Sequence, residues 1–138
     1  TYEGEMSEVV SDLGISNIPF YGIAKGFLTG KYLNQPPAES RLKRDELGWL
    51  ADRLLQENNH KIVTNLVQFS KELGVSMPQL GVAWCLKNPN VSTVILGATK
   101  PEQLQETLHA THILPLLTDE VMERIENILQ NKPQHPQY

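Results

Sequence analysis

The chain has 138 residues, of which 40% are hydrophobic and 20% are charged, and its 12 Lys and Arg against 16 Asp and Glu give a net charge of −4. This composition is typical of one globular domain; it excludes disordered, collagen-like and coiled-coil chains, and without a long basic run it argues against nucleic acid as a partner. No apolar stretch approaches the roughly 20 residues that insert into a bilayer, and the single cysteine, Cys85, supports no disulfide scaffold, so we expect a cytoplasmic protein.

The first predicted elements are a helix and a strand. Residues Glu3 to Leu13 place apolar side chains at helical spacing before Gly14, which predicts an amphipathic helix. Asn17 to Ala24 is short, aromatic and bounded by turn formers, which predicts a buried strand with Pro19 at its beginning. About twenty residues of glycine- and proline-containing loop follow, and a loop of that length is more often functional than idle.

The middle of the chain is predicted to be helical. One helix begins near Asp45, and a second carries apolar residues from Ile62 to Leu73 and ends at Gly74. Ser76 to Gln79 matches a capping box, in which the serine and glutamine side chains satisfy free backbone amides. This motif predicts a third helix, which Asn88 and Pro89 end.

The clearest pattern is a strand, a turn and a helix near the end of the chain. Val91 to Leu96 is rich in β-branched residues and ends in Gly97, which predicts a second strand. Thr99 to Glu102 matches another capping box, which predicts a helix to about Ala110. A last amphipathic helix carries apolar residues between positions 121 and 129, and residues 132–138 are expected to form a mobile tail.

Two strands that alternate with helices predict the α/β class with a parallel sheet. Two parallel strands cannot enclose a core or cover their own edges. A complete (β/α)8 barrel takes about 250 residues, so a chain of 138 residues corresponds to about half of one. The sequence therefore predicts a piece that pairs with further strands.

An anion site is one interpretation of the second strand and its helix. The loops after the last two strands of such barrels often bind phosphate, and the amides that open a helix at Thr99, together with Lys100, would favour an anion. The segment from Lys25 to Arg53 also carries six basic residues against four acidic ones. The alternatives are an ordinary capped helix and a chance cluster of surface charge, and Gly26 to Tyr32 lacks the spacing of a Walker A or Rossmann loop.

Three segments resemble the C-terminal half of the aldo-keto reductases: Ile18 to Tyr32, Ser76 to Leu108 and Ile128 to Pro133. The likeness is closest to the branch that includes the β subunits of voltage-gated potassium channels. It implies that residues 1–138 form the C-terminal portion of a (β/α)8 TIM barrel, with the predicted strands as the seventh and eighth. It also implies an oxidoreductase that transfers hydride between NADPH and an aldehyde or ketone.

The resemblance implies a set of cofactor-binding positions and roles for them. An aromatic ring stacks on the nicotinamide, a following segment runs along the dinucleotide, two basic residues lie over the pyrophosphate, one loop grips the adenosine 2′-phosphate, and a final pair reads the adenine. Phe20 matches the aromatic ring, and the following segment is Tyr21, Gly22, Ile23, Ala24 and Lys25. The basic residues over the pyrophosphate are Lys31 and Arg41, and the loop at the 2′-phosphate contributes Gly97, Thr99, Lys100 and Gln103. The pair that reads the adenine is Glu106 and Thr107. The chain has Tyr21, Gly22 and Ile23 where most members have Ser, Pro and Leu, and Thr107 where they have Asn.

The family's catalytic tyrosine, lysine, aspartate and histidine belong to the first half of the barrel, so we expect this chain alone to be inactive. The four histidines show no spacing that suggests a metal site. Two alternatives remain open. One is a regulatory subunit of a potassium channel that senses the redox state of the cofactor, and the other is a half-barrel that associates with itself through exposed strand edges.

Overall fold

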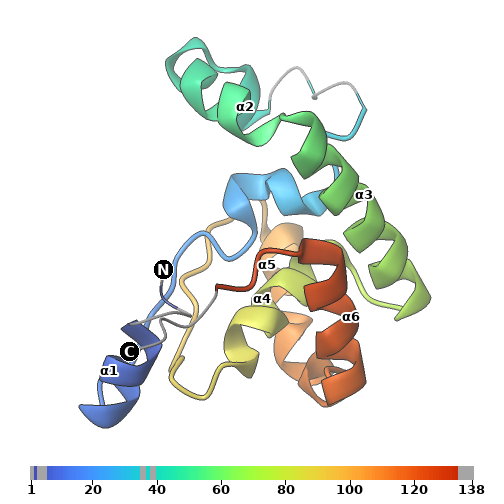
Figure 1. The fold of residues 1–138 in the computed structure, drawn as a ribbon. Helices are drawn as coiled ribbons and strands as arrows, with labels where there is room; N and C mark the ends of the chain where they lie inside the picture. The colour runs from blue at the N-terminus through green and yellow to red at the C-terminus, as the bar shows by residue number, and fades with distance from the viewer. Residues whose placement is uncertain (1, 3–5, 35–36, 38–39, 134–138) are drawn as a thin grey trace.

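Helices make up most of the chain that the structure describes, which is residues 2, 6–34, 37 and 40–133 of a computed structural model (Figure 1). The α-helices and 3₁₀ helices (η), in chain order, are α1 (Ser7–Asp12), η2 (Ala24–Thr29), η3 (Arg41–Lys43), η4 (Asp45–Leu47), α2 (Gly48–Leu54), α3 (Glu57–Glu72), α4 (Met77–Lys87), α5 (Pro101–Leu108), η5 (His109–Leu116) and α6 (Asp119–Leu129).

The two predicted strands are not regular strands in the described residues, and this part of the prediction is wrong. In their place, the two segments form isolated parallel bridges between Asn17 and Val91 and between Phe20 and Ile95. Pro19 has no N–H to donate, and within the described residues each segment pairs only with the other, so a longer ladder is not stabilised. The predicted parallel direction is nevertheless what the bridges show.

The predicted helices agree better with the structure. The capping box of α4 is confirmed: the Ser76 hydroxyl accepts from the Gln79 amide at 3.4 Å, and the Ser76 amide donates to Gln79 Oε1 at 3.1 Å. Gly74 follows α3 with a φ of 75°, as its predicted stop requires. The helix predicted from Asp45 is divided into η4 and α2.

The predictions at the two ends of the chain are covered only in part. Helix α1 begins at Ser7, and residues 3–5 of the predicted helix lie outside the described residues, as do residues 134–138 of the predicted tail. Helix α1 buries none of its side chains, and in Figure 1 it lies apart from the body formed by α3 to α6. Val9 on α1 and the residues at its two caps, Met6 and Leu13, are all more than half exposed.

The buried apolar residues form two clusters, with α3 contributing to both. The larger cluster centres on α4 and includes Leu80 and Ala83, with Leu117 from the end of η5 and Ile125 from α6. The smaller cluster joins residues far apart in the sequence: Phe27, Tyr32, Leu42, Leu50 and Val63. Helix α2 is therefore held to η2 and α3 through this second cluster rather than through the main core.

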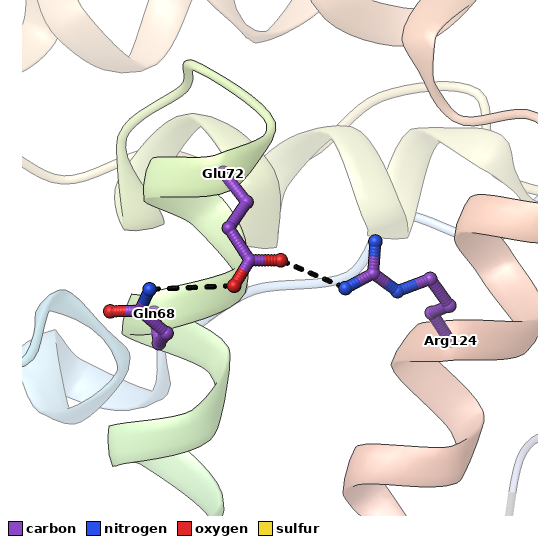
Figure 2. Close-up of polar contacts among 3 residues, drawn as sticks. All are labelled: Gln68, Glu72 and Arg124. Atoms are coloured by element: carbon purple, nitrogen blue, oxygen red, sulfur yellow. Dashed lines mark hydrogen bonds and ion pairs between the residues drawn. The ribbon is translucent and has the colours of Figure 1, made fainter.

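A polar contact ties α3 to α6 on the outside of the larger cluster, as Figure 2 shows. Arg124 Nη2 lies 2.9 Å from Glu72 Oε2, and Gln68 Nε2 donates to Glu72 Oε1 at 3.4 Å. The Arg124 guanidinium also lies 4.5 Å from the ring centroid of Phe69. The hydrogen bond from Arg124 is the main reason that the pKa of Glu72 falls below its ordinary value.

Candidate functional site

The parallel pair brings two distant segments to one edge of the molecule. The Ile95 amide donates to the Pro19 carbonyl at 2.9 Å, and the Asn17 amide donates to the Asn90 carbonyl at 2.7 Å. Because the paired segments run in the same direction, Tyr21–Lys25 and Gly97–Gln103 leave the pair at the same end. We call this end, with these two segments and Phe20, the shared edge.

Aromatic rings lie exposed where the first segment reaches the shared edge. Phe20 is 64% exposed and Tyr21 is 50% exposed. Their ring centroids are 4.5 Å apart, with the planes tilted by 53°. An exposed Phe ring of this kind has a face free for a flat apolar or aromatic ligand group.

Three residues between Tyr21 and Lys25 have a backbone conformation that residues other than glycine rarely adopt. Tyr21, Ala24 and Lys25 have φ values of 62°, 47° and 57°, in the left-handed region. Each such residue costs on the order of 1 to 3 kcal/mol, and strained residues of this kind cluster at functional sites. The sharp turn is closed by the Ala24 amide, which donates to the Tyr21 carbonyl at 2.7 Å.

Close packing beneath the turn explains the small residues in it. A Cβ atom at Gly22 would lie 3.3 Å from Val94 Cγ1 and 3.4 Å from Cys85 Sγ. Ile23 packs on the larger cluster and Ala24 on the smaller one. These two partly buried side chains therefore anchor the turn.

The basic residues of the first half lie on or near η2. Lys31 is exposed, and its Nζ lies 3.2 Å from the position of a Cβ atom at Gly26 and 5.1 Å from the Tyr32 ring centroid. Arg41 begins η3, and its side chain lies outside the described part of the structure. Leu42 is buried with Phe27 and Tyr32, so the backbone of η3 is held beside η2.

The second segment of the shared edge ends at the N-terminus of α5. Gly97, Thr99 and Lys100 are exposed, and Gly97 has open space around it. Lys100 is the N-cap of α5, and no side chain caps the helix. In the first turn of α5, Pro101 has no amide to donate and the Gln103 amide donates to the Lys100 carbonyl at 3.2 Å. The turn thus offers the Glu102 amide and the Lys100 ammonium, although the Glu102 side chain adds an acidic group there.

The predicted capping box at Thr99 and Glu102 is wrong. Pro101 occupies the first turn of α5, so the helix begins after Lys100 rather than after Thr99. Gln103 takes the place of Glu102 as the partner of Thr99. Its Oε1 accepts from the Thr99 amide at 3.0 Å and from the Thr99 hydroxyl at 3.2 Å.

The two residues expected to read the adenine, Glu106 and Thr107, differ in exposure. Glu106 is exposed on α5. Thr107 is buried, and its hydroxyl lies 3.0 Å from the Gln103 carbonyl and 3.1 Å from the Leu104 carbonyl, to which it donates. The Thr107 hydroxyl is therefore used within its own helix rather than presented at the surface.

Trp49 is a residue at this site that the sequence reasoning did not single out. It lies on α2, is 60% exposed, and has the Lys25 Nζ 5.6 Å from its ring. The same Nζ lies 4.5 Å from the Tyr21 ring centroid. The sequence contains a signal for this: Trp49 does not fall on the apolar face of its helix, so its large aromatic side chain is expected to be exposed.

The charge balance of the site is positive in its described part. The ion pairs in the described residues join Lys61 to Glu57 and Arg124 to Glu72. Lys25, Lys31 and Lys100 thus have no carboxylate partner there. Within the same residues, no group of three or more His, Cys, Asp or Glu side chains could hold a metal ion, and no helix has the length and apolar character to cross a membrane.

Comparison with known proteins identifies the family. The model of the "Aldo/keto reductase family" matches residues 2–130. The chain is 42% identical over 132 residues, 95% of its length, to a "Probable voltage-gated potassium channel subunit beta" of Oryza sativa subsp. japonica, and 40% identical over 136 residues, 98% of its length, to one of Arabidopsis thaliana. It spans 40% and 42% of these two curated relatives. The chain belongs to the aldo/keto reductase family.

Proposed function

We propose that residues 1–138 are the C-terminal portion of a (β/α)8 barrel and carry most of the NADP(H) site of an oxidoreductase. The complete protein would transfer hydride between NADPH and an aldehyde or ketone. The single observation that carries this proposal is the parallel pairing of Phe20 with Ile95. It places an exposed aromatic ring and an uncapped helix N-terminus at one edge, where barrels of parallel strands bind ligands.

The described residues offer suitable groups for most parts of a dinucleotide. An exposed Phe20 ring suits a nicotinamide, and the ammonium groups of Lys25 and Lys31 suit a pyrophosphate. The N-terminus of α5, with the Glu102 amide and the Lys100 ammonium, suits a 2′-phosphate, and this favours NADP(H) over NAD(H). Thr107 fits less well, because its hydroxyl is directed to its own helix.

The roles proposed for the chain are binding and orientation. Bound NADP(H) supplies the hydride chemistry. Phe20 and the turn that follows it hold one end of the dinucleotide, and the first turn of α5 holds the other. Arg41, Gly97, Thr99, Gln103 and Glu106 complete the proposed set, while Gly22, Ile23 and Ala24 shape the turn. The chain itself is proposed to contain no catalytic residue, since the proton donor of the family lies in the first half of the barrel.

A regulatory role is the second candidate, and the names of the two relatives favour it. In that case the same cofactor site would report the redox state of the cofactor to a potassium channel, and turnover would be incidental. The cofactor site is common to both candidates, so the proposal of NADP(H) binding does not depend on the choice. A cytoplasmic location is part of both.

The test is a chimera in which this chain replaces the matching region of the Oryza sativa relative. We expect the chimera to bind NADPH in a calorimetric titration and to oxidise NADPH with a model aldehyde above a no-enzyme blank. The 138-residue chain alone should show no turnover, because no positioned acid can protonate the developing alkoxide. Absence of NADPH binding by a folded chimera would overturn the proposal. Binding without turnover would favour the regulatory role.

A further inference from the structure

Trp49 lies far from the shared edge in sequence but close to it in space. Leu50 and Phe27 are both buried in the smaller cluster, and this cluster joins α2 to η2. The adjacent Trp49 side chain is left exposed, with its ring 5.6 Å from the Lys25 ammonium. Leu50 therefore fixes α2 in the smaller cluster, while the neighbouring Trp49 ring stays at the surface.

The Lys25 ammonium is held by two rings rather than by a carboxylate. It lies 4.5 Å from the Tyr21 ring centroid and 5.6 Å from that of Trp49, within the range of cation–π attraction. Ring faces attract the charge but take none of the three N–H donors in the way an acceptor oxygen does. The ammonium is thus fixed in position while its donors stay available.

We propose that Trp49 is a positioning residue of the dinucleotide site, which together with Tyr21 holds Lys25 ready for the pyrophosphate. This inference rests on the proposed function. A lysine side chain loses considerable rotamer freedom when it is fixed on a ligand. Trp49 has already removed part of that freedom in the free chain, so binding the pyrophosphate costs less. Phosphate oxygens then form charge-assisted hydrogen bonds with donors that the rings leave open.

The main test is a double-mutant cycle in the chimera, with NADPH and NADH binding measured by calorimetry. Trp49→Leu should weaken both cofactors about two- to fivefold, which is the range of one exposed cation–π contact. In the Lys25→Met background the same change should have no further effect. Trp49→Tyr keeps a ring face and should restore most of the affinity. A merely structural role of Trp49 would give equal losses with and without Lys25.

A second measurement follows the contact itself in the full 138-residue chain. The chain is labelled with 5-fluorotryptophan, and the Trp49 resonance is identified by its absence in Trp49→Phe. Inorganic pyrophosphate, which has no base to stack, should move this resonance in the unmodified chain and leave it in place in Lys25→Met. Lys71→Met, an exposed lysine of α3, is the matched control and should behave like the unmodified chain.

The outcomes separate this inference from the proposed function. If the chimera binds both cofactors but the losses at Trp49 are independent of Lys25, the positioning role is wrong and the cofactor site stands. A Trp49 resonance that fails to move with pyrophosphate, or that moves equally in Lys25→Met, also overturns the positioning role. If the folded chimera binds neither cofactor, both proposals fail together.

Discussion

The carbonyl oxygen of Gly22 lies 3.0 Å from the point that a Cβ atom at Gly81 would occupy. Gly81 is a buried residue inside α4, and Gly22 is in the strained turn of the shared edge. The absence of a side chain at Gly81 therefore lets the turn lie directly against the helix. Here a core position sets the placement of a proposed cofactor-binding segment.

Gly81→Ala should destabilise the protein even though alanine is the better helix former. The helix gains about 1 kcal/mol from the substitution, but a methyl group at 3.0 Å from a carbonyl oxygen forces the turn away. Overpacking of this kind costs about 1 to 3 kcal/mol. We expect a net loss of up to about 2 kcal/mol in the free energy of unfolding, measured by urea titration of the chimera.

Gly48→Ala is the matched control for this prediction. Gly48 has a helical φ of −52° and no atom within 4 Å of its would-be Cβ. The same substitution there should leave stability unchanged or raise it by up to about 1 kcal/mol. If Gly81→Ala were as well tolerated as Gly48→Ala, the packing of the turn against α4 would be wrongly described.

The contact between Glu72 and Arg124 predicts a small pH dependence of stability. The hydrogen bond from Arg124 lowers the pKa of Glu72 in the folded chain below its ordinary value near 4.5. A lowered pKa means that the contribution is present above the unfolded value and is lost as the pH falls through the folded value. Glu72→Gln should therefore lower the melting temperature at pH 7, and this difference should vanish once the pH falls below the lowered pKa of Glu72 in the folded chain.

The size of this effect is limited by exposure. Both side chains are about half exposed to solvent, so we expect a difference in melting temperature of no more than about 2 °C. Glu123→Gln removes an exposed carboxylate from the same helix, α6, and is the control. A pH-dependent difference of the same size in both variants would contradict a specific role of the Arg124 contact.

The exposed face of α1 predicts association of the 138-residue chain. Met6, Val9 and Leu13 are exposed at helical spacing on a helix that buries nothing. Light scattering of the isolated chain should give a mass above the 15.5 kDa of a monomer. Val9→Glu should shift the population toward the monomer, whereas Ser11→Glu, on an exposed polar position of the same helix, should not. A sharp monomer peak for the unmodified chain would show that this face does not drive association.

The helices could be predicted from the sequence because their signals are local. The Ser76 capping box, the stop at Gly74 and the spacing of apolar residues in α3 all act within a few residues. The strands at residues 17–24 and 91–96 were predicted from local pattern too, but strand formation depends on partners. With one bridged neighbour each in the part of the chain that the structure describes, the two segments pair at single residues instead of in a continuous ladder.

The candidate site was predictable in part for the same reason. The family pattern pointed to Phe20 and Lys100, and both are exposed at the shared edge. It could not show that the Thr107 hydroxyl turns to its own helix, because that depends on burial of the side chain. Trp49 was missed because its contact with Lys25 spans 24 residues of chain and depends on how the smaller cluster folds.

Lys100→Ala should weaken the binding of NADPH to the chimera much more than the binding of NADH. Lys100 is the exposed N-cap of α5, beside the Glu102 amide, and no side chain caps the helix. In the proposed function its ammonium meets the 2′-phosphate, which NADH does not have. A charge-assisted hydrogen bond contributes roughly 1.5 to 3 kcal/mol, which is about ten- to a hundredfold in affinity. Exposure of Lys100 should hold the loss near tenfold.

Lys25→Met supplies the comparison for Lys100→Ala, because the two lysines are assigned to different parts of the cofactor. The pyrophosphate is common to NADPH and NADH, so loss of the Lys25 ammonium should weaken both by the same factor. Loss of the Lys100 ammonium should leave NADH binding within about twofold of the unmodified chimera, since only the helix N-terminus is altered. Fluorescence titration of both dinucleotides against both variants measures the four ratios. Equal losses for NADPH and NADH in Lys100→Ala would mean that the 2′-phosphate does not lie at the start of α5.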